Sequence, residues 1–241
     1  MKNLKTILLL ISITFSAVSC AQWGKGEKIK GNGEVSSIIR SLGEYDGVKV
    51  AGSMDVKLVN GIEGSIVIKG ESNLFEYIDT KISNNNLIIK VKDGYSLKTT
   101  RSLVVTVPCE SINYVALAGS GDINNSGSLD SDDLEVALAG SGDINLNISS
   151  SNTKVKIAGS GDIELKGNSN ALSIAVAGSG DFDGSNLKSV NVDAAISGSG
   201  TAKVNCSGAL KGRVSGSGDI IYKGTPKTKD TKVSGSGSIK S

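Results

Sequence analysis

Residues 134–148 read Leu-Glu-Val-Ala-Leu-Ala-Gly-Ser-Gly-Asp-Ile-Asn-Leu-Asn-Ile, and this stretch decides the fold. On both sides of Gly-Ser-Gly, branched apolar residues alternate with polar or small ones. A period of two residues is that of an extended strand with one buried face, whereas a helix would show a period near 3.6 residues. The stretch therefore predicts two strands joined at a glycine corner.

The same motif recurs along the second half of the chain at spacings of 18 to 21 residues. Its copies begin at Gly119, Gly140, Gly159, Gly178, Gly198, Gly216 and Gly235. Repeats of this length are the signature of a solenoid. We interpret the glycines as corners, which need a positive φ or a close approach of two backbones.

Alignment of the copies on their first glycine reveals two apolar columns that we predict to be the core. Two residues before the glycine stand Leu117, Leu138, Ile157, Val176, Ile196, Val214 and Val233. Four residues after it stand Ile123, Ile144, Ile163, Phe182, Ala202, Ile220 and Ile239. Both columns fall on even offsets, so each would lie on the inward face of its strand.

A coil of about 19 extended residues has a contour of roughly 60 Å, which suits a small two- or three-sided turn stacked in parallel on the next. Propeller blades need longer repeats, and the Leu-x-x-Leu-x-Leu pattern of leucine-rich repeats is missing. The sequence thus predicts an all-β protein, a parallel β-helix or solenoid. The uneven spacing disfavours a strict hexapeptide left-handed helix and favours right-handed or irregular winding.

The first half of the chain belongs to the same unit. The segment from Val48 to Leu58 matches every column except that Met54 replaces the second glycine. Alternating runs follow at 65–69, 86–91 and 103–107, and residues 73–78 could form one helical turn. We expect a β-rich N-terminal lobe continuous with the solenoid.

The chain resembles the putative auto-transporter adhesin, head GIN domain family of bacteria related to Bacteroides and Flavobacterium. The resemblance covers roughly Tyr45 to Thr225 and rests on the hexapeptide Tyr-Asp-Gly-Val-Lys-Val at 45–50, the strand ending Val-Thr-Val-Pro at 105–108, and the Ala-Gly-Ser-Gly-Asp copies. It implies a β-helical, exported protein with an adhesive or envelope role. The resemblance supplies no catalytic residues.

The N-terminus is typical of an export signal. A short basic segment precedes an apolar run at 7–18 that is too short to span a bilayer comfortably, and Ala-Val-Ser-Cys at 17–20 resembles a bacterial lipobox. Lipidation of Cys20 would make the protein an outer-membrane or cell-surface lipoprotein. Ser-Cys-Ala at 19–21 also fits ordinary signal peptidase, with cleavage before Gln22 and a secreted or periplasmic product.

These features divide the chain into four parts. Residues 1–20 are the signal peptide with its lipobox, 21–45 a tether and first edge strand, 46–225 the head GIN β-helical domain, and 226–241 a loop and the last coil. Lysines 223, 227, 229 and 232 around Pro226 are interpreted as a solvated loop that interrupts this coil.

Charge and composition narrow the function. Lys2 and Lys5 lie in the leader, which leaves 24 basic and 24 acidic side chains without a basic run. This balance argues against nucleic acid as a partner and leaves the lipid as the only membrane contact. An unknown surface glycan or protein is the expected partner, no cofactor is implied, and self-association through the terminal coil is an alternative.

We expect no enzyme and assign no catalytic residue. The chain has no histidine and few arginines, and its repeats hold few aromatic residues, which argues against the rival hypothesis of a glycan-degrading β-helix enzyme. We assign no metal site, but one acidic column is a calcium candidate, because stacked carboxylates repel one another and a cation would relieve the repulsion. Alternatively, each aspartate bonds the backbone of its own turn. The column comprises Asp122, Asp143, Asp162, Asp181 and Asp219.

Two cysteines remain beyond Cys20. Cys109 and Cys206 each lie ten residues before a repeat glycine, so they share a phase but sit five coils apart. At ~4.8 Å per coil the separation is roughly 24 Å, whereas a disulfide needs Cα atoms within about 7 Å. We predict two separate thiols.

Overall fold

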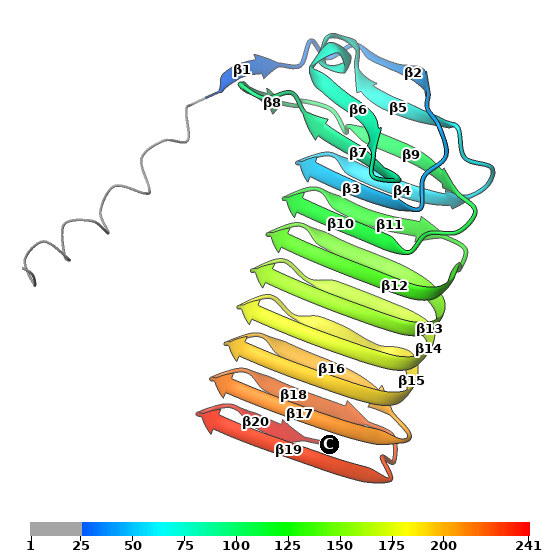
Figure 1. Ribbon diagram of the computed structural model, residues 1–241. Helices are drawn as coiled ribbons and strands as arrows, with labels where there is room; N and C mark the ends of the chain where they lie inside the picture. The colour runs from blue at the N-terminus through cyan, green and yellow to red at the C-terminus, as the bar shows by residue number, and fades with distance from the viewer. Residues whose placement is uncertain (1–25) are drawn as a thin grey trace, which may run out of the picture.

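The computed structural model describes residues 26–241 and shows a β-solenoid of about 7 turns with roughly 19-residue coils, closed at one end by a β-rich cap (Figure 1). Strands that end at Gly-Ser-Gly run from right to left at the front, and those that follow run from left to right behind them, while the chain descends from the cap. This winding is right-handed. No helix in the described part of the chain is long and apolar enough to cross a membrane.

Each coil has a front strand and a back strand, and in the middle coils one long bent strand runs through the second corner. The solenoid strands are β3 (Gly47–Gly52), β4 (Asp55–Asn60), β10 (Tyr114–Gly119), β11 (Asp122–Ser126), β12 (Leu129–Gly140), β13 (Asp143–Gly159), β14 (Ile163–Gly178), β15 (Phe182–Gly198), β16 (Thr201–Cys206), β17 (Ala209–Gly216), β18 (Asp219–Lys223), β19 (Thr228–Gly235) and β20 (Ser238–Lys240). Successive coils pair in parallel with the repeat in register, as Gly140, Gly159 and Gly178 show.

The two predicted columns form the core. Their side chains are buried in every coil down to Val214 and Ile220. In the last coil Val233 is 40% exposed, because no further strand is stacked on it within the described residues. The alternation in sequence is thus converted directly into an inward and an outward face along each strand.

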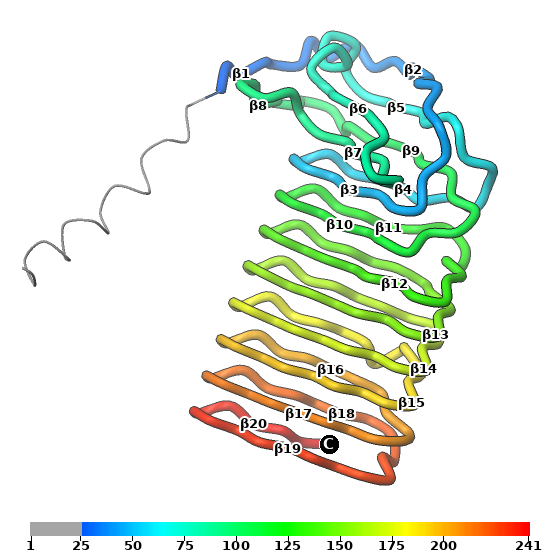
Figure 2. The backbone as a smooth tube through the Cα atoms, viewed as in Figure 1, coloured from blue at the N-terminus to red at the C-terminus, as the bar shows by residue number. Residues whose placement is uncertain are grey.

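The glycine corner requires glycine for two separate reasons, seen at Gly159 and Gly161. Gly159 has a φ of +131°, and a Cβ placed there would lie 2.3 Å from the carbonyl oxygen of Gly140 in the preceding coil. Gly161 has no such φ, but its Cβ would lie 2.1 Å from the oxygen of Gly142. Close stacking lets the N–H groups of Ser160 and Gly161 both donate to the oxygen of Gly140, at 2.9 and 3.0 Å. Figure 2 shows these corners aligned at one edge of the flattened coils.

The cap is built from the segments before and after the first coil. Its elements are β1 (Glu27–Lys30), β2 (Val35–Ser41), β5 (Ser65–Glu71), the 3-10 helix η1 (Ser72–Tyr77), β6 (Ile78–Ser83), β7 (Asn86–Val91), β8 (Tyr95–Lys98) and β9 (Val104–Cys109). Strands β2, β5 and β9 pair antiparallel, and so do β6 and β7, while β1 pairs with β8 alone. The predicted strands at 65–69, 86–91 and 103–107 and the helical turn are all present.

The order of the coils along the axis differs from their order in the chain. Strands β3 and β4 stack on β10 and β11, with Gly52 beside Gly119, as the matching columns predict. On their other side they pair with β7 and β9, which come later in the sequence. The first coil is therefore enclosed between the cap and the rest of the solenoid, so its core is covered on both sides.

Glu71 ties the cap together from a fully buried position. Its carboxylate accepts the N–H of Gly33 at 2.8 Å, the N–H and hydroxyl of Thr100 at 2.8 and 2.6 Å, and the N–H of Arg101 at 3.3 Å. These bonds join three segments that are distant in sequence. The hydroxyl bond from Thr100, followed by the backbone donors, lowers the pKa of Glu71 from 4.5 to about 2 despite burial.

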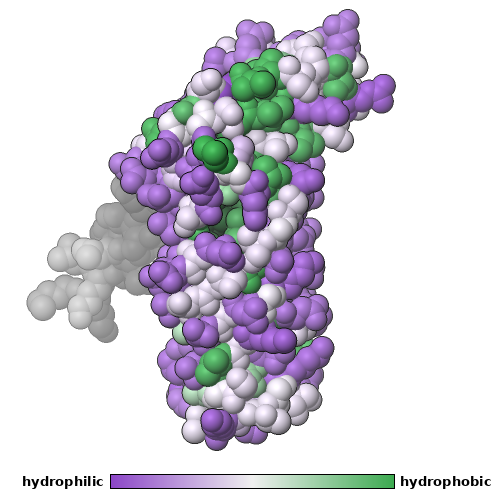
Figure 3. Space-filling model, turned by 90° about the vertical axis from the view of Figure 1, so that its right-hand side faces the viewer, coloured by the Kyte–Doolittle hydropathy of each residue, from purple (hydrophilic) through white to green (hydrophobic). Residues whose placement is uncertain are grey.

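The cap and the last coil each show one notable surface feature. Apolar side chains gather over the cap in Figure 3. In the cap, Ile39 on β2 pairs with Val67 on β5, and both are exposed. At the other end, the predicted lysine loop is shorter than expected, because Lys229 and Lys232 lie within β19 and pair with β17. The segment thus forms a strand of the repeat in spite of its high content of lysine.

Candidate binding surface

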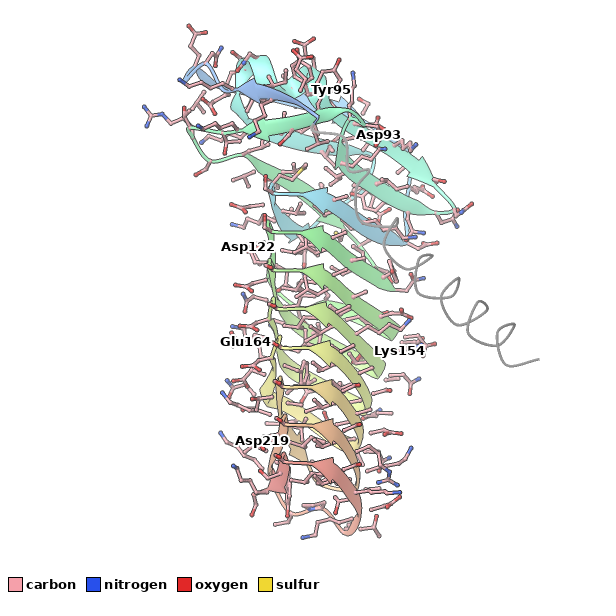
Figure 4. The ribbon with its side chains drawn as sticks, turned by 90° about the vertical axis from the view of Figure 1, so that its left-hand side faces the viewer. Asp93, Tyr95, Asp122, Lys154, Glu164 and Asp219 are labelled. Atoms are coloured by element: carbon pink, nitrogen blue, oxygen red, sulfur yellow. The ribbon has the colours of Figure 1, made fainter. Side chains whose placement is uncertain are left out.

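The aspartate column lies on the back strands, and its carboxylates stack along the axis. Figure 4 shows Asp122 and Asp219 on the side of the solenoid opposite Lys154. Each carboxylate accepts the backbone N–H of the equivalent residue in the next coil: Asp143 donates to Asp122 at 3.2 Å and Asp162 to Asp143 at 3.1 Å. The aspartates thus serve as links between coils, and the interpretation that each bonds its own turn is wrong about the partner.

The last aspartate of the column has the fullest set of partners. Asp219 accepts the N–H and the hydroxyl of Ser238, both at 2.7 Å, and lies 3.6 Å from Lys240. The bonds from Ser238 lower its pKa. Its carboxylate is thus stabilised as an anion by the protein itself.

Chelation is expected to leave the melting temperature unchanged. The N–H donors supply the column with the positive partial charge that calcium would otherwise provide, and no group of three or more Asp, Glu or Cys side chains within 26–241 is placed to hold a metal ion. Thermal unfolding followed by circular dichroism with calcium and with excess EDTA checks this. A fall of several degrees in EDTA would support the calcium hypothesis.

The two cysteines are separate thiols, as predicted. Cys109 and Cys206 are both free and buried. Burial is the main cause that raises the pKa of Cys109 to about 12, and it raises the pKa of Cys206 as well. Both therefore act as small apolar core residues. Cys20, the candidate lipid anchor, lies outside the described residues.

A groove of about 900 Å³ runs along the solenoid axis on the front face, opposite the aspartate column. It follows the start of the front strands from β10 to β19, so each coil contributes equivalent positions. Its walls are Tyr114, Glu135, Lys154, Ser173, Asp193, Lys211 and Asp230 on one row, and Asp133, Asn152, Ala171, Asn191, Ala209 and Thr228 on another. The backbone between the rows forms the floor, and the side chains at these positions are buried in the core, including Leu134, Leu172, Val192 and Leu210.

The charged side chains of the wall largely neutralise one another. Glu135 binds Lys156 at 2.6 Å and lies 3.8 Å from Lys154, Asp193 binds Lys211 at 2.7 Å, and Arg213 donates to Asp230 at 2.5 Å. These are cross-strand pairs between neighbouring coils, exposed enough that each stabilises the fold only weakly. The groove therefore carries alternating charges and no strong field of one sign.

The middle of the front face is its most open part. To the front face, strand β14 contributes only Ala171, Ser173, Ala175 and Ala177, with no long side chain among them. A second, smaller hollow of about 430 Å³ lies beside the groove over β14, β15, β17 and β19. Small side chains thus leave a wide depression where a ligand can approach the backbone closely.

Inspection of the sequence missed this groove. One row of its wall lies five residues before each repeat glycine, a column in which no single residue type predominates. The available signal was alternation: Glu135, Lys154, Asp193, Lys211 and Asp230 change sign from coil to coil around Ser173. Such a pattern indicates an outer face with side chains stacked in register.

Taken together, the coils, the cap and the groove define a capped, right-handed parallel β-solenoid. The chain belongs to the putative auto-transporter adhesin, head GIN domain family, whose model matches residues 44–226.

Solved structures of similar proteins share the fold. A putative adhesin from Bacteroides fragilis is 22% identical, with a TM-score of 0.82 over 88% of this chain and 99% of that one. A putative lipid binding protein from Parabacteroides distasonis is 26% identical, with a TM-score of 0.75 over 89% and 99%. A putative adhesin from Parabacteroides merdae is 22% identical, with a TM-score of 0.69 over 89% and 98%. No curated protein matches the chain.

Proposed function

We propose that this protein is an exported, non-catalytic binding protein of the bacterial cell envelope, anchored through Cys20, which holds its partner in the axial groove. The observation that carries the proposal is the groove itself, a continuous depression over seven stacked front strands. Membership of a family described as putative adhesins supports an adhesive role. The leader and the lipobox-like residues 17–20 support export to the outer membrane or cell surface.

The groove suits binding better than chemistry. Glu135, Asp193 and Asp230 are paired with lysine or arginine, Asp133 accepts the amide of Asn152, and no nucleophile activated by a neighbouring base lies among the lining residues. Repetition over many coils supports the same interpretation, since a stacked surface offers many weak contacts in a row. The balanced charge supports a partner other than nucleic acid.

One set of strains tests the anchor and the groove together. Cells producing the full chain, Cys20→Ala, Ser173→Trp or Asn145→Trp are fractionated, and the purified exported proteins are coated on beads and offered to the envelope fraction of the producing bacterium. Cys20→Ala should leave the membrane fraction. Ser173→Trp should lose most bead adhesion because it fills the groove, and Asn145→Trp, exposed on the back face, should retain it.

Two results would overturn the proposal. Unchanged fractionation of Cys20→Ala removes the lipid anchor in favour of a secreted or periplasmic protein. Equal adhesion of all beads, or none above an uncoated bead, removes the groove as a binding site. A purely structural or self-associating envelope protein is then the better description, and light scattering that shows assembly through the terminal coil would support it.

A further inference from the structure

We propose that the ligand of the groove is a neutral, linear polysaccharide that lies along the solenoid axis. This inference rests on the proposed binding function and names its ligand class. Three properties of the front face lead to it: the paired state of its backbone, the cancellation of its charges, and the chemistry of the groups that remain unpaired.

The backbone under the groove has no free edge except at β19 in the last coil. Strand β12 pairs with β10 and β13, β14 with β13 and β15, and β17 with β15 and β19. An extended peptide usually binds a sheet by adding a strand to a free edge. Here that mode is closed from β10 to β17, and the free edge of β19 lies only at the last coil, so a ligand that lies along the groove must be held by side chains.

The charges of the wall exclude polyanions and polycations alike. A chain of phosphates or uronic acids laid along the axis would meet Glu135, Asp193 and Asp230 in turn. A polycation would meet Lys154 and Lys211 between them. Like charges brought together in this way oppose binding, so an uncharged polymer fits best.

The hydrogen-bonding groups that remain are neutral. In the described chain, the hydroxyls of Ser173 and Thr228 bond no other protein group. The amide of Asn152 donates to Asp133 at 2.8 Å, which leaves its oxygen unused, and Asn191 accepts from Ala209 at 3.1 Å, which leaves its NH₂ unused. Donors and acceptors of this kind match sugar hydroxyls, which both donate and accept.

The spacing of the coils supports a polymer over a single sugar. Equivalent groups recur at about 4.8 Å, close to the advance of one pyranose in an extended β-linked chain, so successive sugars can meet successive coils. Leu172 and Leu210 are only 2% and 1% exposed because their side chains turn into the core, so the floor offers the sugar rings little apolar surface. The one aromatic wall residue, Tyr114, stands at the capped end, with Lys49 Nζ 4.9 Å from its ring centre. Each sugar is therefore bound weakly, and affinity must grow with chain length.

The test uses the full exported protein and a length series of neutral β-linked gluco-oligosaccharides from two to about six units, measured by calorimetry. A neutral glycan array covers other linkages, and oligogalacturonate and an unstructured peptide serve as competitors of other classes. We expect affinity to rise at least tenfold along whichever neutral series binds, to change little with salt because the ligand is uncharged, and to vanish in Ser173→Trp but not in Asn145→Trp. The chains should be recovered at their original length.

Three results would overturn the inference. First, the protein could bind an acidic glycan or a peptide in preference to any neutral chain. Second, its affinity could be independent of chain length. Third and last, it could bind no neutral glycan on the array. If Ser173→Trp still abolishes adhesion to envelopes in the last case, the groove remains a binding site and only its ligand class is wrong. If Ser173→Trp changes neither adhesion nor glycan binding, the proposed function fails as well. Circular dichroism of both tryptophan variants verifies that the fold is intact.

Discussion

Gly159→Ala is expected to destabilise the protein by about 3 kcal/mol or more, enough to unfold much of the solenoid under mild conditions. Alanine at a φ of +131° is strained by about 1–3 kcal/mol. Its Cβ would in addition lie 2.3 Å from the oxygen of Gly140, and relief of that overlap must separate two coils, at a further cost of about 1–3 kcal/mol. Urea unfolding followed by circular dichroism measures the change.

Three other glycines separate the two causes. Gly43→Ala should be neutral, because nothing lies within 4 Å of its Cβ and its φ is ordinary. Gly33→Ala, at a φ of +80° in open space, should show the cost of backbone strain alone. Gly161→Ala has the clash without the unusual φ and should show the steric cost alone. If Gly159→Ala behaves like Gly33→Ala, the corners are less closely stacked than the structure indicates.

The corner also explains why so much of the fold could be predicted from the sequence. In a stack of similar coils, each turn imposes the same steric requirements on the sequence. The requirement for glycine at position 159 therefore recurs at positions 140 and 178. The inward columns repeat for the same reason. The copy beginning at Val48 could be placed in the stack, although more than 50 residues separate it from the next, because the same columns must match on both sides of a coil interface.

What could not be predicted depends on partners that the period does not encode. The alternating runs at β7 and β9 identify strands, but nothing in them indicates that they lie above β3 and β4 instead of below. The Asp column shows a conserved geometry within the repeat, yet the donor that satisfies Asp122 is the N–H of Asp143, which becomes apparent only when the coils are stacked. The groove is harder still to predict from the sequence, because the residues of its wall vary from coil to coil. The proposed ligand depends on which neutral side chains remain unpaired, and that is known only once the coils are stacked.

In the cap, a single side chain, Glu71, holds distant segments together, whereas in the solenoid the repeated contacts between coils do so. Stability of the wild type should fall as pH drops from about 4.5 towards about 2. The pKa of Glu71 is depressed in the folded state, so its contribution is fully present above the unfolded value of 4.5 and is lost as protons bind between 4.5 and about 2. Other carboxylates with lowered pKa values, such as Asp219 and Asp230, contribute to the same fall.

Glu71→Gln isolates the share of this one group. At pH 7 the variant should melt several degrees lower than the wild type, because the amide nitrogen of glutamine would face N–H donors at Gly33 or Thr100 and leave one side of the site repulsive. The gap between the two melting curves should then close as pH falls from about 4.5 to about 2, because Glu71 is protonated first in the unfolded chain and only near pH 2 in the folded protein. Glu110→Gln, at an exposed position, should melt like the wild type throughout. A gap that stays constant down to pH 2 would show that Glu71 acts in the cap through its shape and packing instead of its charge.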